Sequence, residues 1–310
     1  MIVFYILLGV LLLFLLIVLL LYTVTFAANR LLTPKKDYIP RGLGYAPYRE
    51  DILRSIADVR AAEGESVYIQ STDGLSLHGT YYHNFDNAPL MIFYHGYRGT
   101  APRDGCGAFH FCKDWGYNLL SIDQRATGKS EGRAITFGVM ERLDARAWID
   151  YAIKRFGAEQ RIVLMGLSMG ASTVLMACEQ SFPENVRGVV ADSGFTSPRE
   201  IICKVMEQVK LPAKLLYPLV RFSAKWLGGF DPDAADAEEA VKKATVPVFL
   251  IHGEQDMFVP AEMTRRTHAA CASDKGLLIV PGASHAMSYY VDNKAYLEQL
   301  HDFLEGVLKE

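Results

Sequence analysis

The sequence predicts an α/β fold with a doubly wound, mostly parallel sheet, preceded by one transmembrane helix. Short apolar runs alternate with longer stretches that suit helices, which is the pattern of a parallel sheet covered on both faces. Several of these runs end in Gly, Asp or His. The first 29 residues carry no charge, although the 310-residue chain contains 32 Lys and Arg and 35 Asp and Glu. The chain therefore divides into an apolar N-terminal segment and a part of ordinary globular composition.

The N-terminal segment is long enough to cross a bilayer. From Ile2 to Leu21, Tyr5 is the only residue that is not aliphatic, Phe or Gly, and twenty residues form about 30 Å of helix. A buried helix of a soluble protein seldom runs this far without a polar face. A cleaved signal peptide would begin with basic residues and would need a better cleavage site than Thr25-Phe26-Ala27. We therefore expect residues 1–29 to form an uncleaved anchor and its flank.

Basic residues follow this anchor but do not precede it. They are Arg30, Lys35, Lys36 and Arg41. Because basic residues concentrate on the cytoplasmic side, this asymmetry predicts a single-pass protein of the cell membrane whose domain lies in the cytoplasm. Several Pro and Gly residues between 30 and 47 indicate an irregular tether, and residues 48–310 are expected to form one domain.

The overall composition excludes several classes of protein. A net charge of −3 gives no electrostatic reason to expect a nucleic acid partner, and a hydrophobic content of 50% is too high for a disordered chain. The five cysteines are an odd number without a Cys-x-x-Cys pair, so they indicate neither a disulfide framework nor a zinc ribbon.

Six short apolar runs are interpreted as buried parallel strands. They cover residues 90–94, 119–123, 162–166, 189–192, 248–251 and 277–280. Helices are expected at about 139–156, 169–181, 260–271 and 293–308. Residues 66–83, before the first of these strands, resemble an antiparallel hairpin that turns at Thr72-Asp73-Gly74. Ligands of such sheets bind at the carboxyl ends of the strands, so polar residues at those ends are the candidates for a site.

A long insertion interrupts the alternation between two of the strands. Residues of about 195–245 include Leu215, Leu219, Phe222 and Trp226, which lie on one helical face at i, i+4, i+7 and i+11. We expect this segment to form a small helical cap. Its apolar face suits either a hydrophobic acyl or alkyl group of a substrate or packing of the cap against the core.

A candidate nucleophile lies between an apolar run and a helix-compatible segment, in Gly166-Leu167-Ser168-Met169-Gly170. This Gly-x-Ser-x-Gly pattern suits a serine on a sharp strand-to-helix turn, because the glycines relieve backbone crowding and leave the hydroxyl exposed. The helix that follows directs its amide groups toward the position where negative charge develops during acyl transfer. Ser168 is therefore the candidate nucleophile.

The same pattern occurs a second time at Gly128-Lys129-Ser130-Glu131-Gly132. This copy follows turn-like residues instead of a strand, and no helix is predicted to begin at Ser130, so we reject it as the nucleophile. Gly128-Lys129-Ser130 also fits the end of a phosphate-binding loop, but the first glycine of that motif would fall at Asp123.

A serine nucleophile needs a base, and the base needs an acid that orients it. Among the eight histidines, His285 lies in a loop just after the last predicted strand. Asp256 follows the preceding strand by a few residues and gives the chain order Ser, Asp, His. The main rival acid is Asp192, at the end of another strand, and Glu254 is a weaker one.

Together these motifs resemble the α/β-hydrolase superfamily over residues of about 66–308. The resemblance rests on His95-Gly96-Tyr97-Arg98-Gly99, Asp123-Gln124-Arg125 with Gly128 and Ser130, the Ser168 motif, residues 192–197, His252-Gly253-x-x-Asp256 and His285. Within the superfamily the chain is most similar to serine-aminopeptidase-like and prolyl-oligopeptidase-like hydrolases, including membrane-anchored bacterial ones. Many of these are esterases of unassigned substrate.

The resemblance also implies an oxyanion hole formed by the backbone N–H groups of Tyr97 and Met169, and it requires no metal or organic cofactor. His95 and His252 are expected to be structural. The chain departs from the family at Arg125-Ala126-Thr127-Gly128, where relatives often have Arg-Gly-Tyr-Gly or Arg-Gly-His-Gly. This change bears on how the loop packs rather than on the reacting residues.

We therefore expect a membrane-anchored serine hydrolase that cleaves an ester, thioester or amide by two-step acyl transfer, with Ser168, Asp256 and His285 as its triad. The alternatives are a peptidase or an acyltransferase with the same triad, and a non-catalytic binding module on this fold. The expected partners are a small-molecule or lipid-like acyl substrate and the membrane, without nucleic acid. Arg98 and Arg125, near the predicted site, either recognise an acidic substrate group or pair with nearby carboxylates. Neither the substrate nor the oligomeric state follows from the sequence.

Overall fold

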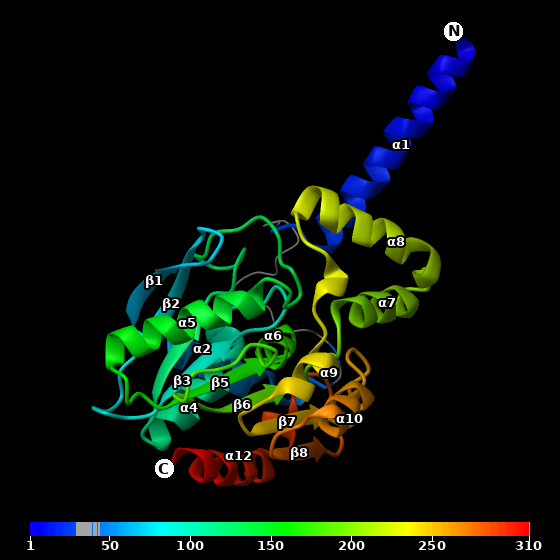
Figure 1. Cartoon of the computed structure of the whole chain (residues 1–310). Coiled ribbons are helices and arrows are strands. Elements are labelled where there is room, and N and C mark those ends of the chain that lie inside the picture. Colours follow the sequence, from blue (N-terminus) through cyan, green and yellow to red (C-terminus); the bar gives the residue numbers. More distant parts are fainter. Residues whose placement is uncertain (29–38, 40–41, 43, 310) are drawn as a thin grey trace.

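The computed structural model of the chain describes residues 1–28, 39, 42 and 44–309. Its centre is a mixed sheet of eight strands in the order β1-β2-β4-β3-β5-β6-β7-β8 (Figure 1). Strand β2 pairs antiparallel with both β1 and β4, whereas β3 to β8 run parallel to one another. The strands are β1 (Glu65–Gln70), β2 (Ser76–Tyr82), β3 (Leu90–Tyr94), β4 (Asn118–Ile122), β5 (Ile162–Leu167), β6 (Val186–Asp192), β7 (Val248–Gly253) and β8 (Lys275–Val280).

Helices cover both faces of this sheet (Figure 1). One face packs against α5 (Glu141–Phe156), α6 (Met169–Ala177) and α10 (Ala261–Ala270). The other face packs against α2 (Arg49–Ala61), α4 (Cys106–Asp114) and α12 (Asn293–Leu308). Alternate residues of β3 point into the two layers, as the two-residue repeat of a strand requires. Both sides of the central strands are buried, which explains why they are apolar throughout.

The predicted fold class is confirmed. All six predicted parallel strands are present, with β6 and β8 beginning earlier than the apolar runs, and the hairpin is formed by β1 and β2. The four predicted helices are present as α5, α6, α10 and α12, although α6 ends at Ala177 instead of 181. Among the described residues, four α-helices and one 3-10 helix were not predicted. They are α2, α3 (Ala101–Asp104), α4, α11 (Ser288–Val291) and η1 (Ala46–Tyr48).

The insertion after β6 forms the expected helical cap. It contains α7 (Pro198–Gln208), α8 (Ala213–Ser223), the π-helical turn η2 (Ala224–Gly228), η3 (Pro232–Ala234), α9 (Ala237–Ala240) and η4 (Val241–Lys243). Helix α7 begins where the Ser197 side chain accepts a hydrogen bond from the backbone N–H of Glu200, with Pro198 in its first turn.

The apolar N-terminal segment forms α1 (Ile2–Thr25), which projects from the body beside α8 (Figure 1). It is long and apolar enough to cross a membrane. Its C-terminal flank is joined to the body: Phe26 is fully buried against the rings of Phe137 and Phe230, and an isolated antiparallel bridge pairs Ala27 with Ala134. The flank of the predicted anchor is thus part of the core. Arg30, Lys35, Lys36, Arg41 and most of the predicted tether lie outside the described residues.

Candidate active site

Ser168 lies on the turn between β5 and α6, with a strained backbone as the motif predicts. Its φ of 55° and ψ of −116° are uncommon for a residue with a side chain. Close approach of the backbone requires the flanking glycines: a Cβ on Gly166 would overlap the backbone of Gly170, and one on Gly170 would overlap the carbonyl group of Tyr94. The two glycines therefore let α6 begin tightly against β3 and β5.

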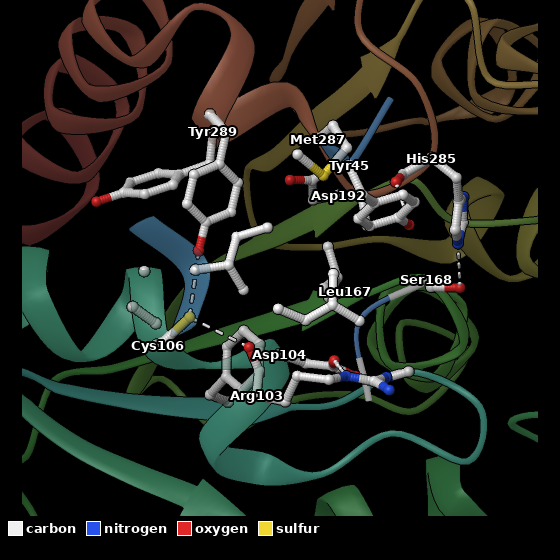
Figure 2. Close-up of a pocket in the computed structure, with 18 of the residues that line it drawn as sticks. Tyr45, Arg103, Asp104, Cys106, Leu167, Ser168, Asp192, His285, Met287 and Tyr289 are labelled. Carbon is white, nitrogen blue, oxygen red and sulfur yellow. Dashed lines mark hydrogen bonds and ion pairs between the residues drawn. The ribbon is translucent and has the colours of Figure 1, made fainter. Parts of the chain in front are cut away.

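His285 and Asp256 meet Ser168 at the carboxyl edge of the sheet. The Nε2 atom of His285 lies 2.9 Å from the Oγ of Ser168 (Figure 2), and its Nδ1 atom lies 2.6 Å from Oδ2 of Asp256. The three side chains follow β5, β8 and β7 in turn. In this arrangement Nε2 can accept the serine proton while the carboxylate holds the proton on Nδ1.

Asp256 is buried and accepts hydrogen bonds from four groups. The backbone N–H groups of Phe258 and Val259 donate to Oδ1, both at 2.8 Å, and Oδ2 faces Nε2 of His252 at 3.1 Å as well as His285. Burial alone would raise the pKa of Asp256, but the hydrogen bonds from the two histidines outweigh it and hold this pKa well below its ordinary value. His252 thus acts on the site through Asp256, in keeping with the structural part expected of it.

Neither rival acid is bonded to His285. Asp192 is buried at the end of β6 and accepts hydrogen bonds from the hydroxyls of Ser193, at 2.9 Å, and Tyr296, at 3.1 Å. Burial raises the pKa of Asp192 to about 6. Glu254 is exposed. Asp256 is therefore the acid that the geometry pairs with the imidazole.

Ser130 of the rejected second motif is half-buried and hydrogen-bonded, and Arg125 is buried and ion-paired. The Oγ of Ser130 donates to the backbone carbonyl of Asp123 at 2.5 Å and accepts the backbone N–H of a β2 residue. Arg125 is buried and forms ion pairs with Asp144, at 2.6 Å, and Asp73, at 2.9 Å. Of the two expected uses of Arg125, the structure therefore favours pairing with carboxylates.

The loop after β3 lies directly against Ser168. A Cβ on Gly96 would come within 3.3 Å of the Ser168 Cβ. The backbone N–H of Gly96 donates to Oδ2 of Asp104 at 2.8 Å, and an ion pair holds that carboxylate in place. Among the described residues the backbone N–H of Tyr97 has no acceptor. The N–H of Met169 belongs to the first residue of α6, where amides lack intrahelical partners. Both amides predicted for the oxyanion hole thus lie at this edge of the sheet without an acceptor in the helix or the loop.

The same loop is tied to the end of α1. The Tyr97 hydroxyl donates to the carbonyl of Thr25 at 2.8 Å, and Nη2 of Arg98 donates to the carbonyl of Val24 at 2.9 Å. Burial raises the pKa of Tyr97 to about 12, which keeps this hydroxyl protonated. The Arg98 guanidinium also lies over the Tyr97 ring, 4.9 Å from its centroid. Arg98 therefore binds backbone carbonyls, which is neither of the two uses expected from the sequence.

A cavity of about 470 Å³ opens beside Ser168 (Figure 2). This volume is typical of sites for small ligands. Its wall is mostly apolar or aromatic and includes Ile52, Phe93, Phe111, Met165, Tyr289 and Tyr290. These residues belong to the sheet and to the layer of α2 and α4, so the cavity lies on the side of the sheet opposite α5 and α6.

Two family models match successive parts of the chain. The model of the alpha/beta hydrolase fold matches residues 89–217, which contain the Ser168 turn. The model of the serine aminopeptidases, S33, matches residues 200–289, which contain Asp256 and His285. The chain has the α/β-hydrolase fold.

Relatives of this chain are about a quarter identical to it over the aligned residues. The YqkD protein of Bacillus subtilis (strain 168) is 25% identical over 246 residues, which cover 79% of this chain and 80% of the relative. The lysophosphatidylserine lipase ABHD12 of Danio rerio is 24% identical over 203 residues, which cover 61% of this chain and 49% of the relative. Among solved structures, the Pyrococcus furiosus esterase Pf2001 has a TM-score of 0.65 at 24% identity, covering 89% of this chain and 97% of the esterase. This last similarity shows that the two proteins share a fold.

A segment near the N-terminus closes one side of the site, although the sequence did not predict that it takes part in the site. The Tyr45 hydroxyl, from the region predicted to be a tether, donates to the backbone carbonyl of His285 at 2.7 Å, and Ile52 of α2 lines the cavity. The helical spacing of Ile52, Ile56 and Val59, all buried, could have indicated α2. Tyr45 itself belongs to no comparable pattern.

The apolar stripe of the cap does not line the cavity. Leu215 is 71% exposed and Trp226 is 60% exposed. The side of α8 that packs inward instead carries Ala213, Tyr217 and Val220. Neither of the two uses predicted for the stripe, binding of an acyl group or packing against the core, therefore accounts for it.

Proposed function

We propose that this protein is a serine hydrolase that cleaves a carboxylic ester, thioester or amide through an acyl-enzyme on Ser168. The observation that carries the proposal is the chain of hydrogen bonds from Ser168 through His285 to Asp256, at 2.9 and 2.6 Å. His285 takes the serine proton as Oγ attacks the acyl carbon, and it then gives that proton to the departing alcohol, thiol or amine.

The second half of the reaction uses the same groups. His285 takes a proton from the water that attacks the acyl carbon, and the proton returns to Oγ of Ser168 as the acyl bond breaks. Asp256 holds the imidazole in the required tautomer and stabilises its cation. The backbone N–H groups of Tyr97 and Met169 bind the oxyanion, and one such donor is typically worth about 3 kcal/mol in the transition state.

The cavity favours a substrate with a hydrophobic acyl or alkyl group, because its wall is mostly apolar. Two similar proteins carry names that point the same way: one is an esterase and the other is a lysophosphatidylserine lipase. We therefore place the cleavage of a lipid-like ester first among the reactions that the triad can perform.

A peptidase is the second candidate, favoured by the match of residues 200–289 to the serine aminopeptidase model. An aminopeptidase needs a carboxylate that binds the free amino group of its substrate. Both aspartates in the cavity wall have partners in the protein: Asp104 pairs with Arg103, and Asp192 accepts two hydroxyl groups. This arrangement favours ester cleavage over aminopeptidase activity.

We further propose that α1 is retained as an anchor in the cell membrane. Two contacts support this proposal: the burial of Phe26 just beyond the helix, and the hydrogen bonds from Tyr97 and Arg98 to the last carbonyls of α1. Cleavage after Ala27 would remove both. The basic residues that follow α1 in the sequence favour a cytoplasmic domain.

Labelling with a fluorophosphonate probe tests the nucleophile. We expect the wild type to be labelled and Ser168→Ala to lose all labelling, because the probe reacts with an activated serine. Ser130→Ala, which removes the serine of the second motif, is the matched control and should remain labelled. Failure of the wild type to label, or equal labelling of Ser168→Ala, would contradict the proposal.

Steady-state kinetics test the acid and the substrate class. Asp256→Asn keeps an acceptor for the two backbone N–H groups but favours the wrong imidazole tautomer, so kcat should fall by about 10⁴. Wild-type turnover of p-nitrophenyl esters should exceed that of aminoacyl p-nitroanilides. Efficient cleavage of the anilides would instead favour the peptidase.

A further inference from the structure

The cap helix α8 meets α1 far from the point where α1 joins the body. The ring of Phe222, at the end of α8, lies 6.0 Å between centroids from the ring of Phe14, near the middle of α1. Between this contact and the body, Val18 is fully buried and the ring of Tyr22 lies against Gly228 of η2. Helix α8 and turn η2 therefore contact the C-terminal half of α1, and α8 crosses α1 near the end that joins the body (Figure 1).

This contact lies at the depth of the hydrocarbon core if α1 crosses a bilayer. Helix α1 has 24 residues, which corresponds to about 36 Å. The rise from Ile2 to Phe14 is about 18 Å, whereas the hydrocarbon core is about 30 Å thick. When Ile2 lies at the far boundary of the hydrocarbon core, Phe14 and the Phe222 ring beside it lie about 12 Å from the boundary on the side of the body.

The side of α1 that faces away from α8 also indicates that the bilayer reaches the Phe14–Phe222 contact. Leu16, Leu19 and Leu20 lie closer to the body than the Phe14 contact, and more than half of each side chain is exposed. A bilayer that ended at the cap would leave these three leucines in water. Covering them with lipid brings the bilayer past the level of α8.

The cap presents an apolar surface of its own at this level. We define the cap surface as Leu211, Leu215, Phe222, Trp226 and Leu227, all of which are exposed. The rings of Phe222 and Trp226 stack with their centroids 6.0 Å apart. Exposed Lys214 and Lys225 stand beside these residues, and a Lys side chain can keep its stem in the apolar layer while its amine reaches toward water.

We propose that the cap surface is embedded in the leaflet that holds the C-terminal half of α1, with phospholipid acyl chains as its partner. The proposal rests on α1 crossing the bilayer and is independent of the chemistry at Ser168. The Phe14–Phe222 contact makes the cap surface continuous with the apolar surface of α1. Lipid that covers one surface therefore also covers the other.

Both rims of the cavity are hydrogen-bonded to α1 or to the cap. On one rim, Tyr97 and Arg98 are bonded to the last carbonyls of α1. On the other, Phe258 lies beside His285, and the carbonyl of its exposed neighbour Met257 accepts a hydrogen bond from Gln208 at the end of α7. Embedding the cap thus brings the cavity close to the lipid surface.

Quenching of tryptophan emission by brominated phospholipid tests the proposal on the full chain. The wild type is reconstituted in phosphatidylcholine vesicles with and without dibrominated acyl chains. We expect bromine to reduce the emission, and we expect this reduction to disappear in Trp226→Phe. The other two tryptophans lie in the body, since Trp148 is fully buried and Trp115 stacks on Phe111 of α4.

Phe85→Trp in the Trp226→Phe background provides the matched control. Phe85 is an exposed aromatic residue that precedes β3, at the edge of the sheet opposite the site. Its emission should not respond to bromine. Equal quenching of the wild type and Trp226→Phe, or quenching of the tryptophan at position 85, would overturn the proposal.

Flotation of the same vesicles separates the two proposals. A chain that does not float with the vesicles would overturn the anchor and the embedded cap together. A chain that floats without quenching of Trp226 would overturn the embedded cap alone.

Discussion

At the residue scale, the site holds two buried aspartates whose pKa values are shifted in opposite directions. Asp256 accepts hydrogen bonds from two imidazoles and two backbone N–H groups, which keep it a carboxylate. Asp192, at the end of the neighbouring strand, accepts only two hydroxyl groups, so burial raises its pKa to about 6. The donors that each aspartate meets, rather than its position near a strand end, set the direction of its pKa shift.

Asp192→Asn should stabilise the fold, and more so as the pH rises. Burial raises the pKa of Asp192 from its ordinary value of 3.8 to about 6 in the folded protein. The free energy of unfolding of the wild type therefore falls as the pH rises from 3.8 to about 6, and it is level above pH 6. The asparagine does not titrate. We therefore expect its gain in the free energy of unfolding to be about 2 kcal/mol larger at about pH 7.5 than at about pH 4.5.

Urea unfolding of the full chain in detergent micelles at the two pH values measures this gain. Glu254→Gln, an exposed acid at the same edge of the sheet, is the control and should change stability little at either pH. A gain for Asp192→Asn that is equal at both pH values would show that Asp192 is ionised in the fold.

The three residues proposed to react follow from local patterns, but their pairing does not. Ser168 is predicted by its glycines, and Asp256 and His285 by their places after apolar strands. The choice between Asp192 and Asp256 depends on how the loops after β7 and β8 approach each other. A Cβ on Gly253 would lie 2.5 Å from the carbonyl oxygen of Ala283, so this glycine permits the approach. A contact between two loops has no signal within either one.

At the scale of elements, the start of α6 is the feature most sensitive to added volume. Gly170→Ala places a Cβ on the carbonyl of Tyr94, a backbone group of β3 that cannot move aside. Helix α6 must then shift away from β3 and carry Ser168 with it. We expect a loss of about 2 kcal/mol or more in the free energy of unfolding and loss of fluorophosphonate labelling.

Thermal unfolding and probe labelling measure the two effects of this substitution. Gly306→Ala is the matched control, because Gly306 is exposed in α12 and a Cβ there meets no atom within 4 Å. The control should be stabilised by about 0.5–1 kcal/mol, as expected for alanine in a helix. Equal behaviour of the two variants would contradict the packing argument.

Two of the helices that escaped prediction, α3 and α4, lack a strong local signal. Helix α4 contains Gly107 and only nine residues, and α3 before it contains four. Short helices with glycine are not stable alone, so packing against the sheet selects them. Phe111 and Cys112 of α4 are buried in that layer. The parallel strands, by contrast, are buried on both sides, so they can be identified in the sequence as continuous apolar runs.

At the scale of the whole molecule, α1 and the body are one packed unit. The residue that joins them is Phe26, which is fully buried and meets the rings of Phe137 and Phe230 edge to face, at 5.8 and 5.2 Å. The last carbonyls of α1 hold the loop of Tyr97 and Arg98. Helix α1 and the loop beside Ser168 thus share contacts.

Phe26→Ala should destabilise the body by about 3–5 kcal/mol, because a fully buried ring leaves a cavity. Phe4→Ala is the control, since Phe4 is 64% exposed in the part of α1 that projects from the body. Thermal unfolding of both variants in detergent micelles measures the difference. Unchanged stability of Phe26→Ala would mean that the flank of α1 does not pack in the core.

The sequence by itself determined the apolar N-terminal helix, the alternation of strands and helices, and the three residues proposed to react, because each depends on local composition or periodicity. Only the tertiary structure decided that Asp256 pairs with His285, that Tyr45 and α2 close one side of the cavity, and that the stripe of α8 faces outward beside α1. These arrangements join residues far apart in the chain, such as Ser168 and His285, which are 117 positions apart. Contacts of this kind depend on how whole elements pack, and no local pattern encodes them.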